Sequence, residues 1–408
     1  MSLDWLRKRF SFKSGVTARE GLPAPPKAEL EPVRSPREVA YRRPRFLAAV
    51  AWKGEGTEVD SRPIYSSPQD HPLLWSSGYA EVINSCKSQF NEDQAVCCHI
   101  SAKRKESCQW EEAKLLVSPD GYVTSYYWAL FDGHGGPAAA MLASNYLHCC
   151  IKQNLEHILE GLMGTHPPMH LSRRCIYQSD PQFVEEKGIC HDHLVIGALE
   201  NAFQDCDEMI CQEMLTTKQS GGCTALTALY LHGKFYLANA GDSRAIIIQK
   251  QSIMQLSSEF TPEMERQRLQ YLARLLGTLA VSRGLGDHQL KVAETNIAVK
   301  PFLSCIPEVK VLDFANHEFL KDDVLVMATD GLWDVLSNEE VAQVVRCFLD
   351  ENKLNPCRFL DLAKHLVCKA RGTKTGNQWT LDSNTPASYD DISVFVIPLW
   401  CQNSLPEP

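Results

Sequence analysis

The amino-acid sequence predicts a layered α+β fold in which helices cover antiparallel sheets. Three apolar runs, over 224–231, 234–238 and 244–248, are separated only by His232-Gly233 and by residues 239–242. Connections this short join antiparallel neighbours, because parallel strands need a crossover of a dozen or more residues. Segments of helical periodicity stand apart from these strands, which argues against a doubly wound parallel sheet.

The helical segments are recognised by their apolar periodicity. Apolar residues recur at helical spacing over 142–159, with Pro137 near the first turn, and again over 195–210. A third helix begins after Ser337, which has a glutamate three residues later, in the spacing of a capping box. Between the first two helices, residues 161–193 are rich in Pro, His, Ser and charge, so we expect an exposed insertion there.

The remaining strands complete the expected domain. Apolar runs of strand length occur at 95–100, 126–131, 324–328 and 392–397. Together with the helices they predict one compact domain over residues 75–400.

Residues 1–70 predict a mostly disordered arm, because prolines and basic residues leave too little apolar surface to offset ordering entropy. Residues 1–50 carry a net charge of +6. Within the arm, residues 2–13 combine helical apolar spacing with interleaved Lys and Arg, a pattern that docks on an acidic membrane surface or on a partner. A frayed basic terminus is the other interpretation of this segment.

Composition excludes several classes of protein. The 408 residues carry a net charge of −9, which argues against general nucleic-acid binding. The sequence contains 16 cysteines but no Cys-x-x-Cys, and it shows neither a secretory signal nor a run of about 20 apolar residues. We therefore expect an intracellular protein, cytoplasmic or nuclear, with reduced thiols.

Carboxylates at strand ends are the most informative chemical feature. Asp132 and Asp330 each follow an apolar run, and Asp391 precedes one. Further acidic residues lie at similar positions: Glu92, Asp93 and Asp242. Several buried carboxylates without matching Lys or Arg imply a divalent cation, since like charges otherwise force protonation. Oxygen ligands favour Mg²⁺ or Mn²⁺, and two such ions would hold a bridging hydroxide and grip a phosphoryl oxygen.

Simpler interpretations exist for some of these residues. Asp132-Gly133 is also a turn signal, and His134 alone is more typical of a solvated histidine. The pair His191 and His193 lies in the predicted insertion, where a metal role is not favoured. Cys98 and Arg104 have the Cys-x5-Arg spacing of a phosphocysteine enzyme, but no glycine between them frees backbone N–H groups to wrap a phosphate.

Seven sequence blocks resemble the metal-dependent serine/threonine protein phosphatases of the type 2C family. They are Asn91-Glu92-Asp93, Phe131-Asp132-Gly133-His134-Gly135-Gly136, Gly222-Cys223-Thr224-Ala225, Asn239-Ala240-Gly241-Asp242-Ser243-Arg244, Leu279-Ala280-Val281-Ser282-Arg283-Gly284-Leu285-Gly286-Asp287, Ala328-Thr329-Asp330-Gly331-Leu332-Trp333-Asp334-Val335 and Asp390-Asp391-Ile392-Ser393. Residues 41–46 and 260–263 are similar to those of the H/J/M subgroup.

The resemblance implies a four-layer α-β-β-α sandwich of two antiparallel sheets flanked by helices, acting on phosphoprotein substrates. It also implies roles for particular residues. Asp132 would bridge two metal ions, Asp330 and Asp391 would bind the first ion, and the Gly133 carbonyl would bind the second. Glu92 and Asp93 would bind the ions through water, and Asp242 and Asp334 would line a weaker third metal position. His134 would be the general acid.

The sequence departs from the family pattern at two places. Ser88 stands where many members have a phosphate-binding arginine, so the neighbouring Lys87 is the candidate substrate-binding cation. Only residues 269–278 connect the preceding helix to the block that begins at Leu279, where the family has more chain. This shortening leaves open a catalytically weak scaffold that binds phosphoproteins. A metal-dependent nuclease shares the two-metal chemistry but lacks a basic groove signature.

Overall fold

The computed structural model describes residues 40–47, 58–103, 122–163, 170–171, 174–175, 190–270, 280–291, 296, 298–300, 302–376 and 378–400. The chain divides into two compact units, Met1–Arg37 and Glu38–Pro408, and the described residues belong to the second. The predicted segment 2–13 lies outside the described residues, as does most of the predicted insertion 161–193.

Two antiparallel sheets form the centre of this second unit. The six-stranded sheet contains, in spatial order, β1 (Tyr65–Ser66), β2 (Gly78–Val82), β18 (Ile392–Pro398), β15 (Val324–Ala328), β11 (Arg244–Ile248) and β12 (Ile253–Gln255). The five-stranded sheet contains β14 (Glu308–Asp313), β10 (Lys234–Ala240), β9 (Ala225–Leu231), β4 (Tyr122–Phe131) and β3 (Gln94–Lys103). Smaller pairings join β13 (Leu285–Gly286), β8 (Gly222–Cys223) and β5 (Gly133–His134), β16 (Thr373–Thr375) with β17 (Gln378–Thr380), and β6 (His170–Leu171) with β7 (Arg174–Cys175).

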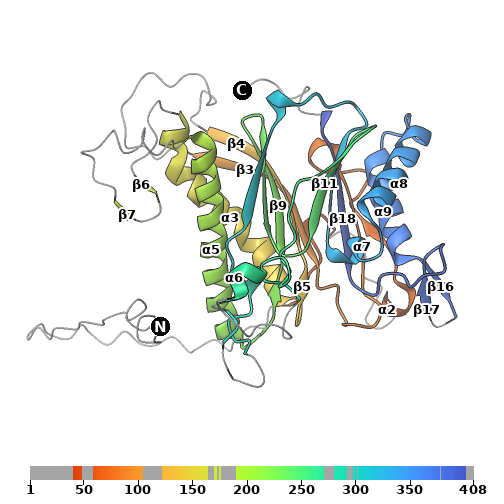
Figure 1. Ribbon diagram of the computed structural model, residues 1–408, viewed down its shortest axis with the longest axis horizontal. Coiled ribbons are helices and arrows are strands. Elements are labelled where there is room, and N and C mark those ends of the chain that lie inside the picture. The colour runs from red at the N-terminus through yellow and green to blue at the C-terminus, as the bar shows by residue number, and fades with distance from the viewer. Residues whose placement is uncertain are drawn as a thin grey trace, which may run out of the picture. The chain divides into compact units, whose positions relative to one another are not determined.

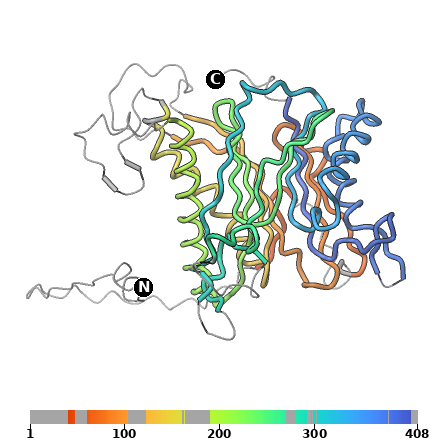
Figure 2. Tube along the Cα trace, in the orientation of Figure 1, coloured from red at the N-terminus to blue at the C-terminus, as the bar shows by residue number. Residues whose placement is uncertain are grey.

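Helices cover the outer face of each sheet, as Figures 1 and 2 show. The helices are α2 (Glu58–Ser61), α3 (Ala138–Met163), α5 (His191–Thr217), α6 (Arg266–Gln270), α7 (Asp330–Trp333), α8 (Asn338–Glu351) and α9 (Arg358–Arg371), with the 3₁₀ turns η1 (Arg45–Leu47), η2 (Leu74–Ser76) and η3 (Phe314–Asn316). α3 and α5 pack on the five-stranded sheet, whereas α8 and α9 pack on the other. A third apolar core, which includes Trp128, Phe235 and Phe395, joins the two sheets. The predicted four-layer α+β sandwich is therefore confirmed.

Local sequence signals explain several element boundaries. The predicted capping box is present, because the Ser337 side chain accepts from the Glu340 N–H and the Glu340 carboxylate accepts from the Ser337 N–H. β9 and β10 form the predicted hairpin, and both turn residues, His232 and Gly233, have the positive φ angles that a tight two-residue turn requires.

The expected third member of this hairpin run lies in the other sheet. β10 pairs with β9 and β14, whereas β11 pairs with β12 and β15, so the short connection after β10 carries the chain between sheets. The Asn239 side-chain amide holds this crossover by donating to the carbonyls of Gly241, Ser243 and Ser258. The expectation that the runs at 224–231, 234–238 and 244–248 pair in one sheet was wrong. The hydrogen bonds of the Asn239 amide stabilise the connection after β10 in place of hairpin hydrogen bonds. As a result, Asp242 lies where the two sheets meet.

All cysteines whose side chains the structure describes are free thiols. Among the described helices, none combines the length and the apolar character that a membrane crossing requires.

Candidate metal centre

Three carboxylates from different elements converge at one edge of the sandwich. Asp132 directly follows β4, Asp242 lies in the crossover between β10 and β11, and Asp330 is the first residue of α7, just after β15. One ligand oxygen from each lies within 4.8 Å of the other two. Since β4 and β10 belong to one sheet and β15 to the other, packing of the two sheets assembles the cluster.

The electrostatics of this cluster fit a bound cation. Burial, reinforced by the neighbouring acidic groups, raises the pKa of Asp132 well above its usual value, that of Asp330 to about 7 and that of Asp242 to about 6. Asp330 Oδ1 is buried without a hydrogen-bond partner. A divalent cation would neutralise these like charges and satisfy this oxygen, because carboxylate oxygens are the hard donors that Mg²⁺ and Mn²⁺ prefer.

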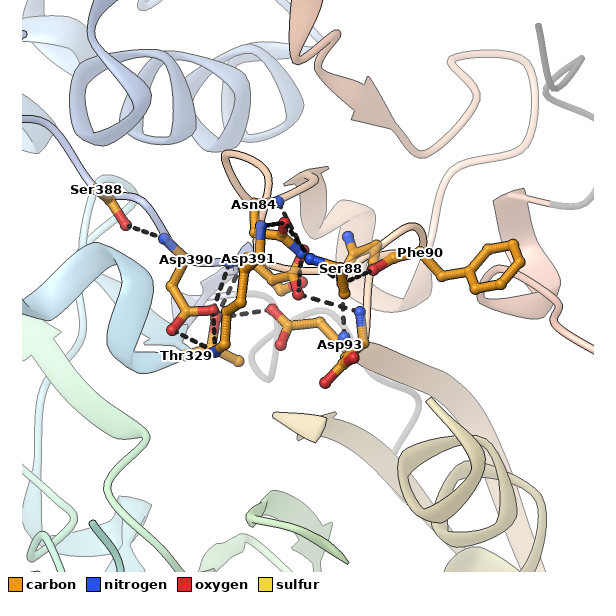
Figure 3. Close-up of polar contacts among 12 residues, drawn as sticks. Asn84, Ser88, Phe90, Asp93, Thr329, Ser388, Asp390 and Asp391 are labelled. Carbon is orange, nitrogen blue, oxygen red and sulfur yellow. Dashed lines mark hydrogen bonds and ion pairs between the residues drawn. The ribbon is translucent and has the colours of Figure 1, made fainter. Parts of the chain in front are cut away.

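A second acidic group contains Asp391 and Asp93 (Figure 3), and it lies near the first, since the Asp93 charge helps to raise the Asp132 pKa. Asp391, just before β18, accepts hydrogen bonds from the Asn84 backbone at 2.8 Å, from the Asn84 side chain and from the Glu92 N–H at 3.1 Å. Its burial raises its pKa to about 7. Asp93 is also buried; its Oδ2 accepts from the Thr329 hydroxyl at 2.9 Å, while its Oδ1 has no partner. The unpartnered oxygen leaves room for a further polar ligand such as water.

Glu92 and Gly133 lie against each other between these groups. Burial raises the pKa of the Glu92 carboxyl, and the nearby Gly136 N–H partly offsets this effect. A Cβ on Gly133 would lie only 2.4 Å from the Glu92 carbonyl oxygen, so a side chain there would push these two backbone segments apart. Glycine at this position keeps the Gly133 backbone beside the acidic residues, as the family resemblance requires.

His134 has a buried partner that sequence reasoning did not assign. Its Nε2 lies 2.7 Å from Asp287 Oδ2; the His134 side chain is 29% exposed and that of Asp287 is 4% exposed. Gly222 makes room for this pair, because a Cβ there would lie 2.2 Å from Asp287 Oδ2 and 2.8 Å from His134 Nε2. The contact fixes the imidazole ring at the edge of the metal cluster.

The predicted cation Lys87 is already engaged. Its Nζ lies 2.7 Å from both carboxylate oxygens of Asp390, and this pairing raises the Lys87 pKa despite partial burial. Ser88 bonds the Phe90 carbonyl and the Asn84 side chain, so it supports the loop (Figure 3). Asp334, one turn after Asp330 in the sequence, is exposed.

Asp242, for which the resemblance implies a weaker third position, contributes an oxygen to the same cluster as Asp132 and Asp330. Three further residues contact the site. Asn84, Thr329 and Asp287 were not predicted as site residues. Thr329 and Asp287 do lie in sequence blocks that carried the resemblance, whereas a lone asparagine such as Asn84 carries no sequence signal.

A carboxylate cluster at the edge of a two-sheet sandwich, with a histidine beside it, is the arrangement of a metal-dependent hydrolase. The comparisons with known proteins agree. Residues 88–378 match the family model of protein phosphatase 2C. The chain is 47% identical to protein phosphatase 1M of Homo sapiens and of Mus musculus, over 98% of this chain and 98% of each relative. It is 38% identical to protein phosphatase 1H of Xenopus tropicalis, over 95% of this chain and 97% of that relative.

The chain therefore belongs to the protein phosphatase 2C family. These relatives confirm the predicted serine/threonine phosphatase class and the H/J/M subgroup, and within it the likeness to the eta (1M) member that the sequence motifs indicated. The alignment with the human protein extends over 469 positions, so that relative contains segments that this 408-residue chain lacks.

The solved structures support the fold. The serine-threonine phosphatase 2C of Toxoplasma gondii superposes with a TM-score of 0.50 at 18% identity, covering 82% of this chain and 98% of that one. At this identity the similarity shows the shared architecture alone.

Proposed function

We propose that this phosphatase hydrolyses phosphoserine and phosphothreonine in proteins with the help of Mg²⁺ or Mn²⁺ at the acidic edge of the sandwich. The cluster of Asp132, Asp242 and Asp330 carries the proposal, because three half-buried carboxylates share so small a volume. The bound cations would supply positive charge that activates water and neutralises the phosphoryl group.

Each acidic residue has a distinct place in the proposed centre. Asp132 and the Gly133 carbonyl, with Asp330 and Asp391, would be ligands to two ions. Glu92 and Asp93 would act through water, which suits the unpartnered Oδ1 of Asp93. Asp334, with Asp242, would serve a weaker third position. Asn84 orients Asp391 by donating to both of its oxygens, so it acts as a support for the centre.

His134 is the proposed general acid. An alkyl leaving group needs a proton, and a positioned acid contributes about 10²–10⁴-fold. Asp287 engages Nε2, which leaves Nδ1 as the ring nitrogen that faces a departing serine or threonine oxygen. Loss of this proton donor should slow hydrolysis of an alkyl phosphate more than that of an aryl phosphate, whose leaving group needs less help.

Lys87 is the proposed cation for the substrate phosphate. In the structure its ammonium group forms an ion pair with Asp390, next to the acidic cluster. A phosphate that enters the site would exchange with Asp390 for this partner, since both present oxygen acceptors to the same ammonium group. We expect weaker substrate binding in a Lys87→Ala variant, because its phosphate would lose a charged donor.

One assay tests the proposal against two other functions. Phosphate release from a phosphothreonine peptide is measured with Mn²⁺, with EDTA and in the Asp330→Asn variant, beside a plasmid-nicking assay. We expect release only with the metal and with Asp330 intact. Peptide binding without turnover would indicate a phosphoprotein-binding scaffold, and nicking would indicate a nuclease; either result would overturn the proposal.

A further inference from the structure

A buried arginine joins two loops at the acidic edge of the sandwich. Arg62 directly follows α2 and is fully buried. Its guanidinium group donates three hydrogen bonds to backbone carbonyls: Nε to Ile83 at 2.7 Å, Nη1 to Ser388 at 2.6 Å and Nη2 to Asp390 at 2.9 Å. Ile83 follows β2, whereas Ser388 and Asp390 precede β18. One side chain therefore connects the loop after β2 to the loop before β18.

These two loops carry Asn84 and Asp391, which belong to the proposed metal centre. The Asn84 N–H donates to Asp391 Oδ1 at 2.8 Å, and the Asn84 side chain donates to both carboxylate oxygens (Figure 3). A backbone hydrogen bond of 2.8 Å, from the Ser85 N–H to the Tyr389 carbonyl, also joins the loops. The hydrogen bonds of Arg62 to both loops therefore help to set where Asp391 lies relative to Asn84.

Arg62 is itself held by residues from the C-terminal part of the chain. Its backbone has a φ angle of 42°, in the left-handed region that residues with a side chain rarely adopt. The Arg371 guanidinium, at the end of α9, donates to the Arg62 carbonyl at 2.8 Å. The Arg62 guanidinium carbon also lies 5.6 Å from the centroid of the Trp379 ring in β17. Such a backbone conformation persists only where its surroundings hold it, so these contacts fix Arg62 in place.

The charge and the hydrogen bonds of Arg62 have opposite effects on a bound cation. Burial lowers the pKa of Arg62 to about 10, and the nearby Asp391 charge partly offsets this effect, so the side chain stays charged at neutral pH. A positive charge near a cation site repels the ion, so charge alone predicts tighter cation binding when Arg62 is removed. The hydrogen bonds predict weaker binding, because loops that are already in place need less ordering when the ion binds. The sign of the change therefore distinguishes the two effects.

We propose that Arg62 is a positioning residue of the metal centre, which holds the loop of Asn84 against the loop of Asp391 before a cation binds. The inference rests on the proposed metal centre. It assigns a role in the enzyme to a residue that lies outside the matched family region of residues 88–378. Loss of Arg62 should therefore weaken divalent-cation binding, although it removes no ligand.

The test measures Mn²⁺ binding to the full chain by calorimetry after the metal has been stripped, together with the melting temperature in EDTA. We expect Arg62→Gln to weaken Mn²⁺ binding at least about tenfold, the equivalent of one hydrogen bond to a charged group. Arg62→Lys keeps the charge but replaces the planar set of donors by one compact ammonium group, so we expect a loss of at least about threefold. Wild-type or tighter Mn²⁺ binding in either folded variant would overturn the inference.

Arg358→Gln is the matched control, because it also removes a buried arginine that donates to backbone carbonyls. Arg358 donates to the carbonyls of Lys321 and Lys353, both at 3.3 Å. Lys321 precedes β15, whereas the proposed ligand Asp330 follows this strand. Arg358→Gln should therefore lower the melting temperature and keep Mn²⁺ affinity within about twofold of the wild type. An equal loss of Mn²⁺ affinity in Arg62→Gln and Arg358→Gln would show a general effect of destabilisation and would also overturn the inference.

Hydrogen exchange in the wild-type chain gives a test that does not depend on the folding of a variant. The N–H groups of Asn84 and Ser85 both donate across the two loops, so we expect them to be protected from exchange in EDTA as well as in Mn²⁺. Rapid exchange in EDTA that slows only with Mn²⁺ would contradict the proposal, because the cation would then fix the loops. Unchanged Mn²⁺ binding in Asp330→Asn would instead overturn the proposed metal centre itself.

Discussion

Replacing Asp287 by asparagine is the sharpest test of how His134 is held. Asparagine keeps the size of the side chain, so packing around this buried position is unchanged. It removes the negative charge from a 2.7 Å contact with His134 Nε2. Hydrogen bonds to charged groups contribute about 1.5–3 kcal/mol. If the Asp287 contact affects catalysis only by holding His134 as the general acid, its loss should lower turnover about 10- to 150-fold.

The assay compares kcat on a phosphothreonine peptide with kcat on p-nitrophenyl phosphate, in Asp287→Asn, His134→Gln and the double variant. We expect the large loss on the peptide and a much smaller one on the aryl ester, because the aryl leaving group needs little protonation. In the His134→Gln background, Asp287→Asn should cost less than about twofold, since residues that act as a unit are not additive. Equal losses on both substrates, or additive losses in the double variant, would refute the reasoning.

Three further outcomes are expected. Gly222→Ala should lower peptide turnover at least about tenfold while the protein stays folded by circular dichroism, because its Cβ would lie 2.2 Å from Asp287 Oδ2; wild-type turnover would contradict the close packing. Burial raises the pKa of Asp330 and Asp391 to about 7, so the metal-free protein should lose stability as the pH rises from about 4 to about 7. Saturating Mn²⁺ should abolish that loss in thermal melts, and a metal-free melting temperature independent of pH would contradict these shifts. Ser337→Ala should destabilise the fold by about 1 kcal/mol in urea unfolding, through loss of the capping box; an unchanged midpoint would show that the box contributes nothing.

Much of the fold follows from sequence because its signals are local. The hairpin of β9 and β10 is specified by apolar runs on both sides of a two-residue turn, and the start of α8 is specified by the capping box at Ser337. α9 (Arg358–Arg371) was not predicted, although it packs on the six-stranded sheet. The crossover at Asp242 was also missed, because a hairpin and a sheet change can have the same length. What separates them is the amide of Asn239, whose partners include Ser258, far along the chain.

In the site, too, features with a local sequence signal could be predicted, whereas features that depend on distant contacts could not. Strand-end carboxylates such as Asp132 and Asp330 could be identified from sequence, because an acidic residue beside a buried strand is costly without a cation. The grouping of these carboxylates could not be predicted from sequence, since it depends on how the two sheets pack against each other. Asp287 and Asn84 act only through a partner, so neither residue alone carries a signal. Lys87 was named as a cation, but its pairing with Asp390 spans 303 positions of sequence.

Packing of the two sheets is proposed to build the binding site for divalent cations. Crystals soaked in Mn²⁺ test this directly, through an anomalous difference map at the manganese edge. We expect strong peaks between the carboxylates of Asp132, Asp242 and Asp330, and we expect these peaks to be lost in Asp330→Asn crystals. A map without signal at that edge of the sandwich, or with manganese bound only elsewhere, would contradict it.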